Sequence, residues 1–298
     1  MTLADEVAKA SPQSTQTPAR GRRPHRSRQR FNPSTPILVL IILASLVPFI
    51  WAFLTAIKPF TAAFTSPPTW TFDPTVKAFS DLYYGTEFVA VFINTMIVAA
   101  AAVIVSLAIA APAAYGLARY VGSIGVWLLV LALVFRALPR FAVVLPFYDA
   151  ARALGLYDTR TMLVIALVAI NQPFTLWMLR NFFAAIPKEL DESAMVDGCN
   201  RFKGFVYVIL PTATPGLMTA GIFTFLLAYQ EYLVAVALTQ TDAVTLPVFV
   251  ASFGTTEDAG LYQVIAASSI ALAVPIVLLS LFAQRYLVAG LTGGAVKG

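Results

Sequence analysis

Long runs of apolar residues, separated by short polar segments, fill the chain after residue 35. Six of the runs are close to the roughly 20 residues that a helix needs to cross a bilayer. They predict spanning helices over Pro36–Ile57, Phe88–Ala111, Ile124–Tyr148, Thr161–Phe183, Ala213–Leu238 and Val264–Leu287. The pattern therefore predicts an all-α polytopic membrane protein with one transmembrane domain over residues 36–289.

The polar connections between the runs differ in composition. Lys58–Glu87 is too rich in proline for a long helix, because proline has no N–H and clashes with the preceding turn. We expect it to be an extracytoplasmic loop, and Thr239–Gln263, which has no Lys or Arg, to be a second one. Nearly every span also contains proline, which fits either ordinary tolerance in membrane helices or a kinked bundle around a pathway.

Composition agrees with a membrane protein and excludes several other classes. Of the 298 residues, 59% are hydrophobic and only 12% are charged. A soluble domain has about 25% charged residues. A single cysteine, Cys199, excludes an internal disulfide. The lone histidine, His25, lies before the first span, so no histidine is available for metal binding or catalysis in the bundle.

Positive charge predicts the orientation of the chain. Residues 1–35 are rich in Pro, Ser, Gln and Arg, and we expect a disordered basic tail that rests on anionic lipid headgroups rather than binding nucleic acid. Its arginines precede the first span: Arg20, Arg22, Arg23, Arg26, Arg28 and Arg30. Most other Lys and Arg residues lie on the same side of the predicted spans, so the positive-inside rule places both termini in the cytoplasm.

A polar segment, residues 187–211, separates the fourth and fifth spans on the predicted cytoplasmic side. Pro187 suits the first turn of a helix, and Asp191 with Glu192 would follow where the helix dipole favours anions. Leu190, Ala194 and Gly198 recur every four residues and would share one face. This face of small residues could dock into a groove of another protein; the plainer interpretation is an amphipathic helix on the membrane surface.

The spacing within this segment resembles a family signature. Glu192-Ser193-Ala194, three residues, Gly198, nine residues and Val208-x-Leu210-Pro211 are similar to the "EAA" motif of importer permeases driven by ATP-binding-cassette subunits. Ser193 and Val208 depart mildly from the usual Ala and Ile. Other segments resemble the carbohydrate-uptake branch of these permeases, and most closely the second permease of maltose-type importers. They are Asn94-Thr95, Ala113–Arg119, Leu156–Thr159, Thr245–Pro247 and the tail of residues 290–298.

The resemblance implies a non-catalytic permease of a bacterial cytoplasmic membrane. A helix over residues 187–203 would couple it to a separate ATPase through Leu190, Glu192, Ser193, Ala194, Asp197 and Gly198. The implied partners are a homologous second permease, two ATPase subunits that bind ATP and Mg, and an extracytoplasmic substrate-binding protein. The Gly294–Gly298 tail would reach between the ATPase subunits. This chain itself would bind no cofactor and no metal, and it lacks the Gly-Lys pair of a phosphate-binding loop.

Three charged residues fall inside the predicted spans. Arg136 and Arg140 would lie about 18 and about 24 Å into a straight third span, on one face, and Glu231 would lie about 24 Å from Pro215. Intramembrane charge needs a partner or a water-filled cavity. We expect an Arg140–Glu231 ion pair that braces the third and fifth helices, while Arg136 either braces or contacts a polar sugar derivative, neutral or anionic.

Four polar residues complete the candidate substrate pathway. Asn171 and Gln172 lie near the middle of the fourth span, where amides serve either as hydrogen-bonding glue between helices or as ligands for sugar hydroxyls. Tyr229 and Gln230 precede Glu231, where relatives often carry Trp-Asn. The alternative function is an ion-coupled secondary transporter of a small polar solute, which would need embedded acidic groups and usually an internal repeat.

Overall fold

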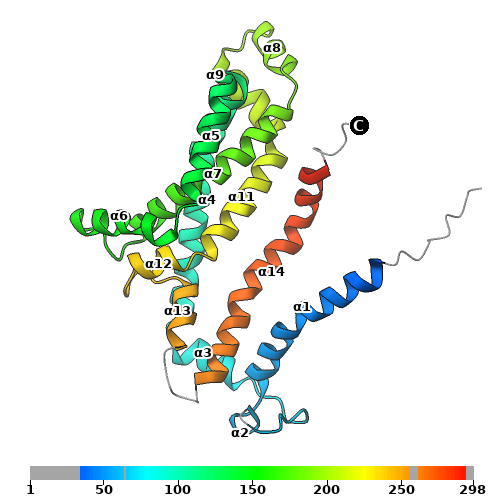
Figure 1. Cartoon of the computed structure of the whole chain (residues 1–298), viewed down its shortest axis with the longest axis vertical. Helices are drawn as coiled ribbons and strands as arrows, with labels where there is room; N and C mark the ends of the chain where they lie inside the picture. The colour runs from blue at the N-terminus through cyan, green and yellow to red at the C-terminus, as the bar shows by residue number, and fades with distance from the viewer. Residues whose placement is uncertain (1–33, 64, 255–260, 293–298) are drawn as a thin grey trace, which may run out of the picture. The chain divides into compact units, whose positions relative to one another are not determined.

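The computed structural model describes residues 34–63, 65–254 and 261–292, and within these ranges the chain forms helices and no strand (Figure 1). The helices are α1 (Ser34–Ile57), α2 (Phe60–Ala63), α3 (Lys77–Gly85), α4 (Phe88–Arg119), α5 (Gly122–Arg136), α6 (Arg140–Ala153), α7 (Arg160–Ala185), α8 (Glu189–Val196), α9 (Arg201–Gly204), α10 (Leu210–Thr212), α11 (Thr214–Tyr229), α12 (Leu233–Leu238), α13 (Leu246–Phe253) and α14 (Tyr262–Thr292), with a π-helical segment at Phe205–Ile209. The described residues from Val47 onward form one compact unit, and the described residues up to Leu46 form another. The predicted basic tail, up to residue 33, and the Gly294–Gly298 tail lie outside the described residues.

Helices α4, α7 and α11 pack along one another and form the centre of the larger unit (Figure 1). Leu163, Leu167 and Tyr229 are almost wholly buried in one part of this core, and Leu179 and Phe183 are buried in the other. Van der Waals packing holds such membrane helices together, and hydrogen bonds between small polar residues add to it.

Close approach of α11 to α7 depends on a glycine. A Cβ on Gly216 would lie 2.5 Å from Cγ of Phe182, so only glycine fits there without displacing the ring. Further along the same two helices, the hydroxyls of Thr175 and Thr224 are 2.9 Å apart and link them. The seam between α7 and α11 therefore combines close backbone approach with a buried hydrogen bond.

Among the described residues, four helices are each long and apolar enough to cross a membrane: α1, α4, α7 and α14. Two bent pairs bring the number to six if each pair counts as one span. The first, second, fourth and sixth predicted spans match these four helices, but α4 continues past the predicted end, through Pro112 to Arg119. The apolar run predicted the membrane-crossing part and missed the less apolar extension.

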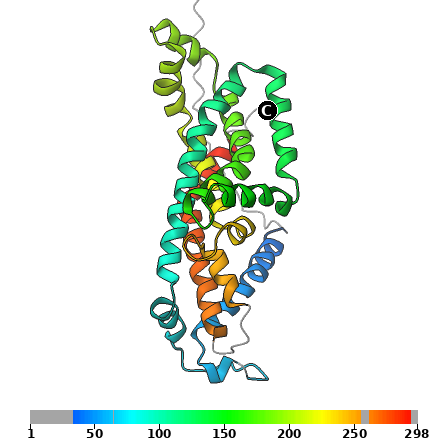
Figure 2. The same cartoon turned by 90° about the vertical axis from the view of Figure 1, so that its left-hand side faces the viewer.

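The third predicted span, Ile124–Tyr148, is not one continuous helix. The segment forms two helices, α5 and α6, which meet at an angle of 89°. Figure 2 shows α6 turning sharply away from the end of α5. The bend falls at Ala137–Pro139, because Pro139 has no N–H to donate and its ring disfavours a helical conformation at Leu138. Arg136 ends α5 and Arg140 begins α6, so the depth and the common face expected for a straight helix do not apply.

The predicted fifth span, Ala213–Leu238, is also broken. Helix α11 ends at Tyr229, and α12 begins at Leu233. A second bend, of 74°, precedes α11 at Ala213, shortly after Leu210-Pro211. Pro215 lies in the first turn of α11, where its missing N–H is not needed.

The two predicted loops contain short helices. Helix α3 lies in the proline-rich connection, and α13 starts in the second loop directly after Thr245. Asn94 and Thr95 of α4 hold that second loop: the Asn94 amide donates to the Val244 carbonyl at 2.6 Å, and the Thr95 hydroxyl accepts from the Leu246 N–H at 2.8 Å. Segments that are far apart in the sequence therefore meet at this end of the bundle.

Asp158 fixes the loop that follows α12. It has a positive φ of 58°, and its carboxylate accepts backbone N–H groups of residues 240–243 at distances from 2.9 to 3.1 Å. Burial alone would raise the pKa of Asp158, but these four donors hold the pKa well below its ordinary range. The carboxylate is thus a template around which the loop folds.

We expect Asp158→Asn to lower the midpoint of thermal unfolding at pH 7, because hydrogen bonds to a charged acceptor contribute about 1.5–3 kcal/mol. A lowered folded-state pKa means that this contribution is complete above the unfolded pKa of about 3.9 and is lost as pH falls below it. The gap between wild type and variant in detergent should therefore close on acidification. Asp149→Asn, at an exposed position of α6, is the control and should match wild type at every pH.

Candidate functional site

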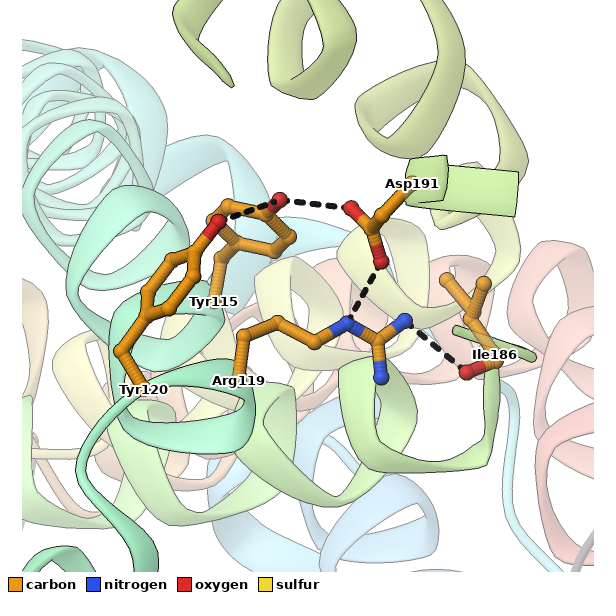
Figure 3. Close-up of polar contacts among 5 residues, drawn as sticks. All are labelled: Tyr115, Arg119, Tyr120, Ile186 and Asp191. Carbon is orange, nitrogen blue, oxygen red and sulfur yellow. Dashed lines mark hydrogen bonds and ion pairs between the residues drawn. The ribbon is translucent and has the colours of Figure 1, made fainter. Parts of the chain in front are cut away.

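A buried ion pair joins the end of α4 to the beginning of α8 (Figure 3). Nε of Arg119 lies 2.8 Å from Oδ2 of Asp191, and the two side chains are 5% and 16% exposed. The guanidinium also donates through Nη2 to the Ile186 carbonyl at 2.9 Å, and the Tyr115 hydroxyl donates to Oδ1 of Asp191 at 2.6 Å. We call Tyr115, Arg119, Ile186 and Asp191 the α4–α8 joint.

Local sequence places both charges of the joint at helix ends that suit them. Arg119 lies in the last turn of α4 and Asp191 in the first turn of α8, where the helix dipole favours a cation and an anion respectively. Tyr120, which follows Arg119, brings its hydroxyl to 3.3 Å from that of Tyr115, and its ring centre lies 4.9 Å from the Arg201 guanidinium. The joint therefore connects α4, α8 and the start of α9.

Helix α8 ends at a glycine-dependent cap. Gly198 has a φ of 84°, its N–H donates to the Met195 carbonyl at 3.1 Å, and the Cys199 N–H donates to the Ala194 carbonyl at 2.9 Å. These bonds resemble a Schellman motif, which satisfies carbonyls that the helix leaves free. Gly198 therefore lies just past the end of the helix, which covers Glu189–Val196, not the expected 187–203, and Pro187 precedes it.

The expected docking face of α8 is wrong for its central residue. Ala194 is only 3% exposed and faces Gly204, where an added Cβ would come within 3.5 Å of the Ala194 side chain. Leu190 packs against the core that includes Phe183 and Phe205. The small residues thus seat α8 against its own chain, because a four-residue repeat shows only that residues share a face, not what covers it.

The other expected coupling residues lie at the surface. Glu192, Ser193, Asp197 and Gly198 are exposed, and the Ser193 hydroxyl donates to the Glu189 carbonyl at 2.8 Å. Large apolar side chains that the sequence reasoning did not select stand out beside them: Val196 is 87%, Phe202 74% and Tyr207 73% exposed. We call Met195, Val196, Phe202 and Tyr207 the apolar surface of the α8 end; their apolar character in a short polar segment was the signal available.

A charged cluster lies where the two broken spans meet. Nη1 of Arg140 is 3.3 Å from Oε2 of Glu231, so the predicted Arg140–Glu231 ion pair is confirmed. Oε1 of Glu231 accepts the Val234 N–H, in the first turn of α12, at 3.4 Å. Arg136 donates through Nη1 to the Asn171 side-chain oxygen at 3.2 Å and to the Ile170 carbonyl at 3.4 Å, with its guanidinium 5.2 Å from the Phe174 ring centre.

The remaining residues of the candidate pathway lie in different surroundings. The side-chain oxygen of Gln172 accepts from the Ser106 hydroxyl at 2.7 Å, and its amide donates to the Ser106 carbonyl at 3.3 Å. This is the interhelical role expected of an amide here. Tyr229 is 0% exposed and donates to the Leu272 carbonyl at 3.0 Å. Gln230 is exposed and lines a cavity of 540 Å³ together with Pro247 and Leu272.

The sequence reasoning noticed Asp191 and Arg119 without pairing them. From the sequence, Asp191 is expected only to interact with a helix dipole, and Arg119 is only the last residue of the Ala113–Arg119 resemblance. Because the two residues lie far apart in the sequence, nothing in local periodicity could join them. An available signal was their chemistry: opposite charges on the same predicted side of the membrane, with Arg119 after the second predicted span and Asp191 early in the predicted 187–203 helix.

Comparisons with known proteins agree with this architecture. The sequence profile described as "Binding-protein-dependent transport system inner membrane component" matches residues 106–293. The chain is 36% identical to the diacetylchitobiose uptake system permease protein DasC of Streptomyces coelicolor and 34% identical to the trehalose transport system permease protein SugB of Mycobacterium tuberculosis, each over 87% of this chain and 95% of the relative. It is 34% identical to the probable ABC transporter permease protein y4oR of Sinorhizobium fredii, over 85% of this chain and 90% of that protein.

A solved structure has the same fold. It is the crystal structure of a bacterial ABC transporter involved in the import of the acidic polysaccharide alginate; its matching chain has a TM-score of 0.72 and 22% identity, over 84% of this chain and 94% of that one. The helical architecture described above is thus a fold already known among importers. The profile match and the relatives together show that this chain belongs to the binding-protein-dependent transport system inner membrane components, the permease family of ABC transporters.

Proposed function

We propose that the chain is the permease subunit of an ATP-driven importer that carries a sugar or sugar derivative into the cytoplasm by alternating access. It would work with a second permease, two ATPase subunits that bind ATP and Mg, and an extracytoplasmic binding protein. Both termini and the α8 end would face the cytoplasm. The named substrates of relatives, diacetylchitobiose and trehalose, support a sugar as the cargo.

The observation that carries the proposal is the combination of a firm internal joint and a free apolar surface at α8. The α4–α8 joint fixes α8 to the central helix α4 through a buried ion pair. Beyond the joint, Val196 and Phe202 expose apolar area that a partner could cover. An ATPase that moves this surface would move α4 with it, which is the rigid-body coupling that alternating access requires.

An ion-coupled transporter is the weaker alternative. Such a transporter needs an embedded acid that can bind and release its coupling ion. Among the described residues of the candidate spans, Glu231 is the acid that lies deep in the bundle, and its two oxygens are taken by Arg140 and the Val234 N–H. Ion coupling would have to break both contacts in every cycle.

We expect Val196→Asp to reduce copurification of the ATPase at least about tenfold and to abolish uptake, because it replaces roughly 1.5–3 kcal/mol of apolar burial by an unpaired charge. Leu154→Asp, which is also a highly exposed position but lies between α6 and α7, should leave copurification unchanged. Uptake should also stop when the phosphate-binding lysine of the ATPase is replaced. Continued uptake with an inactive ATPase would refute the proposed function and favour ion coupling.

A further inference from the structure

Both broken spans of the chain come together at the same charged cluster. The α5–α6 bend carries Arg136 and Arg140, and the break between α11 and α12 carries Glu231. Irregular backbone within a membrane is tolerated where protein buries it or where it lines a cavity. Interrupted helices therefore point to a place where a transporter handles its substrate.

The cluster has more positive than negative charge. Glu231 uses one oxygen for Arg140 and the other for the α12 backbone. Within the described part of the chain, the ion pairs are Arg140–Glu231 and Arg119–Asp191, so Arg136 has no carboxylate partner. Its contacts are a carbonyl, an amide oxygen and an aromatic ring. An unbalanced charge within a span is costly and marks a functional role by default.

A cavity of 150 Å³ adjoins both arginines. Besides Arg136 and Arg140, it is lined by apolar residues of α5, α6 and α7, among them Phe135, Val143, Phe147 and Pro173. Its volume is several times the roughly 30 Å³ of a water molecule in the liquid, which suits one acidic group but not a whole disaccharide. The two hydrogen bonds that Arg136 makes within the described chain both use Nη1, so the donors on Nε and Nη2 remain for a ligand.

We propose that the importer carries a sugar bearing an acidic group, and that Arg136 receives this group in the cavity between α5, α6 and α7. A guanidinium binds a carboxylate, sulfonate or phosphate through paired N–H donors, so the shared chemistry is that of an oxyanion. Arg140, held by Glu231, adds positive field without being free to pair fully. This inference rests on the proposed sugar-import function and deepens it by naming the substrate class.

The test uses the purified complete importer in detergent, whose thermal unfolding is followed during titration with glucuronate or with glucose. We expect glucuronate to stabilise wild type more than glucose does. Arg136→Gln should weaken the apparent affinity for glucuronate at least about tenfold, and Arg136→Lys should retain part of it because the charge remains. Arg152→Gln, an exposed arginine at the far end of α6, is the matched control and should behave like wild type.

Several outcomes would overturn the inference. Equal stabilisation by glucose and glucuronate, or an unchanged response of Arg136→Gln, excludes an acid-binding role for Arg136. If acetate stabilises as strongly as glucuronate, the cavity binds small anions and the sugar assignment fails. Uptake by the reconstituted importer is measured separately: an importer that takes up only neutral sugars refutes the acidic class alone. Glucuronate binding without ATP-driven uptake of any sugar refutes the proposed function instead.

Discussion

Asp191→Ala is expected to destabilise the protein by about 3–5 kcal/mol, because it leaves a charged guanidinium buried without its partner. The Arg119 side chain is only 5% exposed, so water cannot replace the lost carboxylate, and the Tyr115 hydroxyl loses its acceptor as well. Uptake should fall with stability, since α8 would no longer be fixed to α4. Thermal unfolding in detergent and uptake in proteoliposomes measure the two effects.

A paired substitution separates folding from transmission of motion. Replacing both partners by apolar residues, Arg119→Met with Asp191→Leu, should restore much of the stability, because a buried ion pair exchanged for well-packed apolar groups is often neutral. If uptake stays low in this stable double variant while the ATPase remains bound, the joint transmits motion. Glu192→Ala, which changes an exposed neighbouring carboxylate, should leave stability unchanged. Wild-type stability of Asp191→Ala alone would contradict the importance of the joint.

Glu231→Ala is expected to have the second largest effect, a loss of several kcal/mol in stability and a lower amount of protein in the membrane. It removes the counter-charge of Arg140 and leaves two arginines unbalanced, and each charge within a span costs at least about 2.5–3.5 kcal/mol. It also removes the acceptor of the Val234 N–H, and one hydrogen bond contributes about 0.5–1.5 kcal/mol. Quantitative membrane immunoblots and thermal unfolding check the prediction.

Two variants make this result interpretable. Glu231→Gln keeps an oxygen for the Val234 N–H and loses only the charge, so its loss should be intermediate between wild type and Glu231→Ala. Glu87→Ala removes a carboxylate just before α4 that makes no side-chain cap hydrogen bond there, and it should behave as wild type. A Glu231→Gln variant as impaired as Glu231→Ala would assign the whole effect to charge and none to the hydrogen bond with the Val234 N–H.

The sequence predicted where apolar helices lie better than where they bend. The four spans that match single helices did so because twenty apolar residues leave a membrane protein few alternatives. The positions of the bends could not be predicted from the prolines alone. Proline occurs inside α4 at Pro112 and inside α7 at Pro173 without ending either helix. At Pro139 the chain turns through 89°, where Arg136 and Arg140 find partners on other segments. Proline allows a bend, and tertiary contacts decide whether one forms.

The sequence predicted which residue types form the candidate site, but not which way their side chains face. The Arg140–Glu231 pair followed from two charges that had to find partners in an apolar medium. Which face of α8 turns inward did not follow, because Ala194 and Val196 are both small enough to pack and only their neighbours distinguish them. Similarly, nothing near Asp158 in the sequence indicates that its carboxylate organises residues 240–243, which lie 82 to 85 positions away.

The depth of the Arg119–Asp191 pair has a consequence for experiments in different buffers. At roughly 0.1 M salt, dissolved ions weaken the interaction between exposed charges, and the interaction is largely lost beyond a separation of about 10 Å. They reach this pair poorly, because its two side chains are only 5% and 16% exposed. The contact between α8 and α4 should thus be insensitive to ionic strength.

A partner held by the exposed carboxylates Glu192 and Asp197 would instead loosen as salt is added, since exposed charges are screened. A salt titration can therefore distinguish, within one short helix, the contacts that belong to the chain from those made with another protein.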